Sequence, residues 1–165
     1  MSFAVLRLRG KGDLRASVRD TLRMLHLTRQ NHCSILPQDA TVRGMLQLVK
    51  DHVTWGEIDP EVLAKLLLKR GRQVGDRPID DGFVKAHSKF KSIWDLSQAL
   101  AKGEARLSDV RDLRPVIRLP PPRRGYRGIK RGYPDGGDLG YRGKAINELL
   151  VRMLVEEGKE GKDGL

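Results

Sequence analysis

Residues 31–58, NHCSILPQDATVRGMLQLVKDHVTWGEI, decide the fold of this chain. Asn31 to Leu36 predicts a strand that ends at Pro37, because proline cannot donate a hydrogen bond to a strand ladder. Asp39 is a suitable N-cap for the helix that follows. The apolar face of that helix consists of Val42, Met45, Leu46 and Val49. Val53 to Ile58 predicts the next strand, so this stretch alone gives strand, helix and strand.

The residues before this stretch predict another strand and another helix. Phe3 to Arg9 alternates apolar residues with Arg7 and Arg9, which indicates a strand with its arginines on an open face or at its end. Asp13 is a suitable N-cap for a helix that runs to about His26. The expected fold class is therefore α+β: a small three-stranded sheet in strand–helix–strand–helix–strand order, with two helices on one face. We expect the opposite face to be free for binding.

The rest of the chain predicts helices around an extended basic loop. Expected helices lie at 60–70, 81–87, 92–102 and 144–155, a short turn of helix at 108–113, and a short strand at 116–119. We therefore expect three regions. They are a sheet-and-helix RNA-binding core (1–58), a helical C-terminal subdomain (59–155) that contains the basic Gly/Pro-rich loop (114–144), and a disordered tail (156–165).

The positive charge of the chain is concentrated in that loop. Residues 114–144 hold nine basic and two acidic residues, and so contribute +7 of the formal net charge of +11. Tyr126, Tyr133 and Tyr141 lie among the basic residues, and glycine and proline interrupt any helix. Arginines that pair with phosphates and tyrosines that stack on bases are typical of RNA binding. We expect such a loop to contribute little to the packing of the free protein.

No pattern in the chain predicts catalysis, a metal site or a cofactor. Cys33 is the one cysteine, and its neighbour His32 points to the opposite face of the predicted strand. CxxC and HExxH motifs are absent, and the glycines at 136–140 lack the P-loop ending. We expect no membrane span, and a single cysteine fits a reducing cytoplasm.

Several short motifs, in their order and spacing, resemble one family. They are Leu6 to Gly10, Asp20 to Leu25, Asn31 to Cys33, Arg43 to Met45 leading to Val49-Lys50, Arg118 to Gly125, Gly136 to Gly140 and Ile146 to Leu149. Together they resemble the large-subunit ribosomal protein thirty family over about residues 2–155. The absence of a long basic N-terminal extension and the length beyond the short bacterial core favour its archaeal long form. Pro122 and the charged tail after Glu156 depart from the family pattern.

The resemblance implies a core related to ferredoxin-like folds and a structural role without catalysis. The implied partners are large-subunit (23S-type) ribosomal RNA, the 5S RNA near which long members lie, and neighbouring ribosomal proteins, with location in the cytoplasmic ribosome. It also implies that the loop from Pro120 to Gly143 enters RNA, and that Arg29, Asn31, His32 and Arg43 are contacts of the core.

The composition and the resemblance together give one set of candidate RNA-binding residues. They are Arg7, Arg9, Lys11, Arg15, Arg19, Arg23, Arg29, Asn31, His32, Arg43, Lys50, Arg118, Arg123, Arg124, Tyr126, Arg127, Lys130, Arg131, Tyr133, Tyr141, Arg142 and Lys144.

Two other functions stay open on the sequence. A small nucleic-acid-processing enzyme would need carboxylates gathered at a metal site, and the basic loop has only Asp135 and Asp138. A DNA-binding protein would also be basic, and only a comparison of its affinities for DNA and RNA distinguishes it from a structural RNA-binding protein. The stripe formed by Arg15, Arg19 and Arg23 also fits a solvated helix face.

Overall fold

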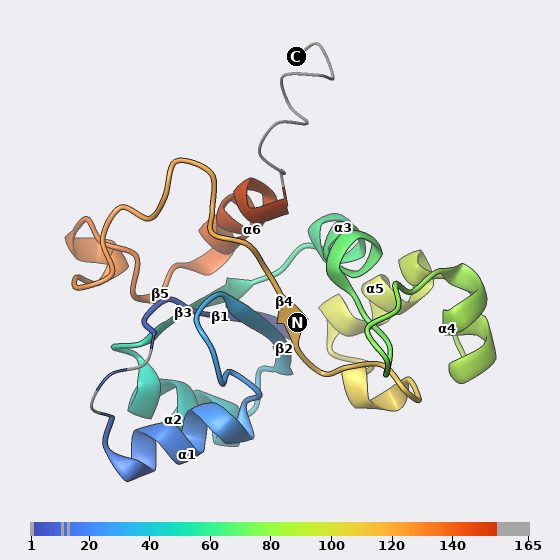
Figure 1. The fold of residues 1–165 in the computed structure, drawn as a ribbon, viewed down its shortest axis with the longest axis horizontal. Coiled ribbons are helices and arrows are strands. Elements are labelled where there is room, and N and C mark those ends of the chain that lie inside the picture. The colour runs from blue at the N-terminus through green and yellow to red at the C-terminus, as the bar shows by residue number, and fades with distance from the viewer. Residues whose placement is uncertain (1, 11, 13, 155–165) are drawn as a thin grey trace.

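The computed structural model describes residues 2–10, 12 and 14–154 (Figure 1). Lys11, the expected N-cap Asp13, Val155 at the expected end of the last helix and the expected tail lie outside the described residues. The elements are β1 (Ser2–Arg7), α1 (Ala16–Met24), β2 (His32–Pro37), α2 (Ala40–Val49), β3 (Val53–Glu57), α3 (Pro60–Arg70), α4 (Asp81–His87), α5 (Ile93–Lys102), η1 (Leu107–Asp109), β4 (Ile117–Arg118), η2 (Tyr133–Asp135), β5 (Gly140–Tyr141), η3 (Gly143–Ala145) and α6 (Ile146–Leu154).

The sheet has five strands in the order β4-β2-β1-β3-β5, rather than the three that we expected. The α+β class and the strand–helix–strand–helix–strand order of the first part are confirmed. β1 lies at the centre and pairs antiparallel with β2 and with β3. β4 pairs antiparallel with β2, and β5 pairs parallel with β3. The boundary at residue 58 stays a prediction, and both added strands cross it because they come from the region after α5.

Helices α1 and α2 cover one face of the sheet. Successive side chains of a strand point to opposite faces, so Phe3 and Val5 share this face with Val53 and Trp55 of β3. They pack with buried residues of the two helices, among them Leu22 and Leu46, each 1% exposed. The Asp39 carboxylate accepts a hydrogen bond from the Val42 amide at 2.8 Å and fixes the start of α2, as the sequence predicts.

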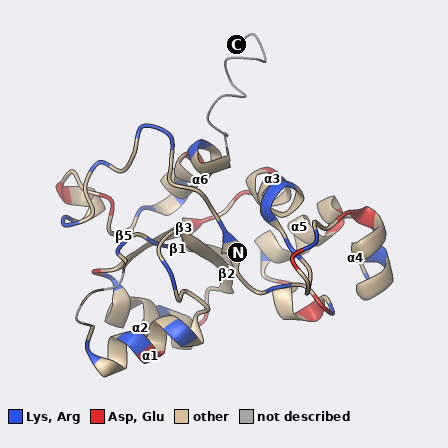
Figure 2. Cartoon of the chain, in the orientation of Figure 1, with Lys and Arg blue, Asp and Glu red and all other residues tan. Residues whose placement is uncertain are grey.

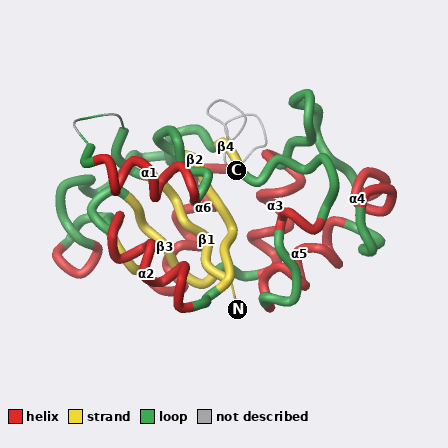
Figure 3. The backbone as a smooth tube through the Cα atoms, turned by 90° about the horizontal axis from the view of Figure 1, so that it is seen from below, coloured by secondary structure: helices red, strands yellow, loops and turns green. Residues whose placement is uncertain are grey.

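The opposite face is covered as well, so the expectation of a free binding face was wrong. Ala4 and Leu6 of β1 and Cys33 and Ile35 of β2 belong to a second core with residues of α3, α5 and α6. Figure 1 shows α6 and α3 above the sheet and α1 and α2 below it, and Figure 3 shows the same layers from below. The physical reason is that β1 is buried over its whole length. Because it has apolar residues on both faces, helices must pack on both faces of the sheet.

Gly56 of β3 makes the connection from β5 to α6 possible. A Cβ atom built on Gly56 would lie 1.8 Å from the carbonyl oxygen of Gly143 and 2.8 Å from its carbon. Any side chain there would push η3 and α6 away from the sheet. Glycine is therefore required by close approach of two backbones rather than by backbone conformation.

Gly56→Ala is expected to destabilise the folded chain by about 1–3 kcal/mol, the cost of overpacking a rigid contact. Urea unfolding followed by circular dichroism measures the change. Gly44→Ala in α2 is the matched control, because a Cβ there meets nothing within 4 Å and alanine favours the helix by about 1 kcal/mol. Equal stability of G56A and the native chain would show that η3 moves freely.

Candidate nucleic-acid interface

The basic residues lie in two regions on either side of the sheet. Figure 2 shows Lys and Arg along α1 and along the segment that leads from β4 to α6, with others on α3 and α4, whereas Asp and Glu are spread over several elements. Six cations of the second region are exposed: Arg118, Arg123, Arg124, Arg127, Lys130 and Arg131. We call residues 118–132 the basic arm. Its exposure next to α6 gives the molecule one strongly positive surface, whereas positive and negative residues balance around α4.

The basic arm is held by a buried carboxylate at its base. Asp138 is 0% exposed, and its Oδ2 accepts a hydrogen bond from the Gly128 amide at 2.9 Å. The Arg127 guanidinium lies 4.6 Å from the centre of the Tyr133 ring and donates to the Gly137 carbonyl at 2.7 Å. Arg127 thus packs against residues that follow the arm, contrary to the expectation that the loop contributes little to the packing of the free protein. Asp138 was missed as a site residue, although its place among cations was a signal.

Arg142 is buried beside Asp138, and this corrects its prediction as an RNA contact. The guanidinium donates to Asp138 Oδ1 at 2.9 Å and to the Asp138 carbonyl at 2.7 Å. Its Nε donates to the hydroxyl of Thr54 in β3 at 2.8 Å. Its ring partner is Tyr133, 4.9 Å from the guanidinium carbon. Arg142 therefore joins the arm to the sheet instead of facing a phosphate.

Arg7 is the second predicted contact that the structure buries. Arg7 is 3% exposed and donates to the Leu27 carbonyl at 2.9 Å and to the Arg9 carbonyl at 2.8 Å. Burial lowers the pKa of Arg7, although an arginine remains a cation at neutral pH. It is the last residue of β1, so of the two expected placements the strand end is correct, and its alternation with Val5 puts it on the face covered by the helices rather than on an open face.

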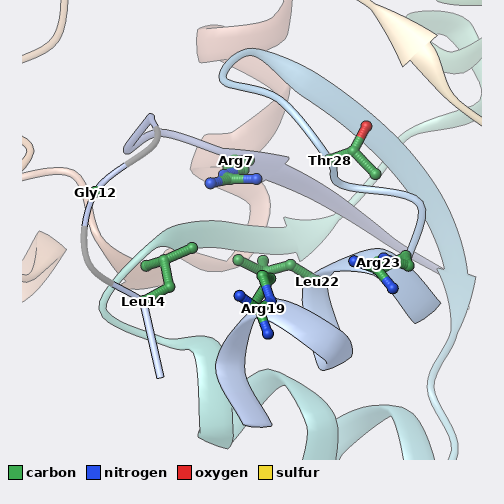
Figure 4. Close-up of a pocket in the computed structure, with 7 residues that line it drawn as sticks. All are labelled: Arg7, Gly12, Leu14, Arg19, Leu22, Arg23 and Thr28. Carbon is green, nitrogen blue, oxygen red and sulfur yellow. The ribbon is translucent and has the colours of Figure 1, made fainter. Parts of the chain in front are cut away.

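A cavity of about 460 Å³ lies between this arginine and α1. Figure 4 shows Arg7 from β1 on one side and Arg19 and Arg23 from α1 on the other. Arg19 and Arg23 are exposed at its mouth, while Leu22 forms part of its wall. The two exposed guanidinium groups at this opening, with the buried positive charge of Arg7 behind them, favour an anion such as a phosphate group. The structure thereby brings Arg7 of β1 close to Arg19 and Arg23, which lie one helical turn apart on α1.

The tyrosines of the predicted site have three different surroundings. Tyr126 is half-buried, its hydroxyl donates to the Asn31 side-chain oxygen, and burial raises its pKa. Tyr133 packs under Arg127 and Arg142. Tyr141 alone is half exposed, at 50%. Tyr126 and Asn31 therefore anchor the arm to β2, and Tyr141 is the tyrosine best placed to stack on a base.

The remaining predicted residues separate by exposure. Exposed ones are Arg15, Arg19, Arg23, Arg29, Arg43, Lys50, Tyr141, Lys144 and the six cations of the basic arm, whereas Arg9, Asn31, His32, Tyr126 and Tyr133 are partly buried. Lys11 lies outside the described residues. Among the described residues, no group of three or more His, Cys, Asp or Glu side chains could hold a metal ion. No helix in the described part of the chain is long and apolar enough to cross a membrane.

The fold and this surface define a class: a small basic α+β protein with cations arranged for nucleic acid. The sequence model of "Ribosomal protein L30p/L7e" matches residues 3–53. Large ribosomal subunit protein uL30 of Methanopyrus kandleri is 47% identical over 149 residues, which cover 89% of this chain and 100% of the relative. The protein of the same name from Archaeoglobus fulgidus is 46% identical over 151 residues, 92% and 99% of the two chains. The chain belongs to the L30p/L7e family, as the motifs in the sequence indicated.

Loss of the Arg142 guanidinium is expected to destabilise the chain strongly. Arg142→Ala removes the nearer cation of the buried Asp138 carboxylate, at 2.9 Å, and leaves only the Arg127 Nε at 3.8 Å, so we expect a cost of up to about 3–5 kcal/mol. Arg142→Lys keeps a charge but cannot donate to Thr54 and Asp138 in the same fork geometry, so we expect partial loss. Denaturant midpoints measure both. Arg131→Ala, at an exposed position of the same arm, is the control and should unfold like the native chain.

Acid is expected to destabilise the free protein through two histidines. Burial and then neighbouring arginines lower the pKa of His32, and burial and then Arg9 lower that of His52. A folded pKa below the unfolded value of 6.5 means that the neutral form is favoured by folding. Stability is therefore full above pH 6.5 and is lost as pH falls through and below that value. Urea midpoints between pH 7.5 and 5.5 should fall less in the double variant H32Q/H52Q, and parallel slopes would refute the assignment.

Proposed function

We propose that this chain is a structural constituent of the large ribosomal subunit, in the cytoplasmic ribosome, which binds and stabilises large-subunit ribosomal RNA. What supports the proposal is the basic arm: six exposed cations on a segment that is anchored to the protein by Asp138 and Tyr126. Full-length relatives that share nearly half of the sequence carry the name of a large-subunit protein.

We infer that the two basic regions bind different RNA segments. The arm and α1 lie on opposite sides of the sheet, so one RNA helix cannot follow both along a straight path (Figures 1 and 2). The protein then acts as a wedge that neutralises phosphates of two neighbouring RNA segments and lets them approach each other. Contact with 5S RNA and with neighbouring ribosomal proteins belongs to this proposal, and the exposed α3 and α4 surface is available for such neighbours.

The structural role of the protein requires no catalytic step. RNA folding is stabilised here by charge neutralisation, hydrogen bonds and stacking, which need no bond to be broken. Pre-folding of the arm adds to affinity, because an anchored segment loses less conformational entropy on binding than a flexible one.

Affinity for a large-subunit rRNA fragment is expected to fall about 10³-fold or more between 50 and 200 mM salt, if six or more phosphates are neutralised. The triple variant Arg124→Ala/Lys130→Ala/Arg131→Ala removes three exposed cations of the arm. It should weaken binding and reduce the slope of log affinity against log salt by about 3, roughly one for each phosphate contact. Filter binding or fluorescence anisotropy at several salt concentrations measures the slope.

The matched control removes three exposed cations from in and just after α4, away from the arm, Lys85→Ala/Lys89→Ala/Lys91→Ala. The two variants have the same net charge, so a specific interface requires the arm variant to lose far more affinity than the control. Equal losses would mean a diffuse electrostatic attraction. Equal affinity for duplex DNA and for folded rRNA at the same salt would contradict the proposed partner.

A further inference from the structure

An aromatic cavity lies between α2 and strands β1, β3 and β5 of the sheet. Its volume is about 360 Å³, and its lining includes Phe3, Trp55 and Tyr141. The Tyr141 ring centre lies 6.4 Å from that of Phe3, edge-on, and 6.3 Å from that of Trp55. Phe3 and Trp55 are only 5% and 6% exposed, whereas Tyr141 is 50% exposed. The cavity therefore has two buried rings and a third ring that stands open to an incoming group.

The rest of the lining consists of Leu46 and of polar groups from the loop before α2, from α2 itself and, at Glu57, from β3. Gln38, Arg43 and Gln47 line the cavity, and the Nε2 atom of Gln38 is buried with no hydrogen-bond partner among the described residues. A buried amide donor without an acceptor is unfavourable, so a turn of the Gln38 side chain toward an occupant that supplies a carbonyl or ring nitrogen is favoured. Arg43 and Gln47 are exposed beside it.

Glu57 fixes the open ring in place. The Tyr141 hydroxyl donates to Glu57 Oε1 at 2.6 Å, and this hydrogen bond raises the pKa of Tyr141. The neighbouring Arg142 is held by Asp138 and Thr54. Tyr141 is thus oriented from its hydroxyl and from its backbone before any ligand arrives, which lowers the entropic cost of stacking.

We propose that this cavity binds one unpaired nucleobase of RNA. The base would stack on Tyr141, its polar edge would accept from the Gln38 amide, and the guanidinium of Arg43 would face the adjoining phosphate. The inference rests on the proposed RNA-binding function and adds a site that distinguishes single-stranded nucleotides from duplex, whose bases are already stacked and paired.

The chemistry of the lining favours a base over an apolar side chain from a protein. An aliphatic group would fill the space between the rings but leave the Gln38 amide unsatisfied. It would also make no use of Arg43, whereas every nucleotide carries both a π face and a phosphate. The positive net charge of the chain favours the same occupant.

Trp55 reports directly on this cavity. The chain has two tryptophans, and the other, Trp94, is 42% exposed in α5. In the full-length Trp94→Phe variant, Trp55 becomes the one tryptophan, so its fluorescence can be followed during titration with the RNA trinucleotides AAA, CCC, GGG and UUU. We expect saturable quenching by at least one trinucleotide, and about tenfold weaker binding after the further change Gln38→Leu. Gln98→Leu in α5 is the matched control and should leave the titration unchanged.

The outcomes separate this site from the function on which it rests. One outcome would overturn the base pocket and leave the proposed function intact. In it, the rRNA fragment binds in a salt-dependent manner, but no trinucleotide quenches Trp55 even at low salt. If the native chain did not bind the rRNA fragment at all, the proposed function itself would be overturned. Ultraviolet irradiation of assembled large subunits should crosslink the peptides that contain Phe3 or Tyr141 to a nucleotide. Crosslinks from those peptides to protein alone would assign the cavity to a protein neighbour and overturn the proposal.

Discussion

The buried ion pair between Asp138 and Arg142 is the constraint on which the rest of the surface depends. It lies where three parts of the chain meet: the base of the basic arm through the Gly128 amide, the sheet through the Thr54 hydroxyl, and the start of η3. A buried charge is costly when alone and tolerated when paired and hydrogen-bonded. The pair therefore permits essentially one arrangement of these parts, in which β5 joins β3 and α6 lies across the sheet.

This constraint also explains how so basic a segment remains ordered. Cations crowded on a short stretch repel each other and favour an expanded chain. Here Arg127 and Arg142 are directed inward against one aromatic ring and one carboxylate, while Arg124, Lys130 and Arg131 stay outside. The inner cations hold the segment, so that the outer ones are presented at a fixed place. Sequence reasoning treats all of them alike, because each is an arginine or lysine among glycines.

Much of the fold could be predicted from local signals. The N-cap at Asp39, the apolar face of α2 and the alternation in β1 each act over a few residues, and the structure has those elements. β5 could not be predicted, because two residues, Gly140 and Tyr141, carry no strand pattern and pair with β3 only through distant contacts. The packing of α3 and α6 on the second face of the sheet could not be predicted for a related reason. The sequence shows the apolar residues of these helices, but it does not show against which surface they pack.

Candidate binding residues were harder to predict than elements, since the deciding quantity is burial. Arg7 and Arg9 are two residues apart in one strand, yet one is enclosed by carbonyl groups and the other is partly open. The same contrast separates Tyr126 from Tyr141 in one loop. An arginine or tyrosine that is fixed by partners within the protein shapes the surface. One that is exposed beside such a residue can bind RNA. In this chain the two kinds alternate closely, so a positively charged sequence becomes an ordered positively charged surface.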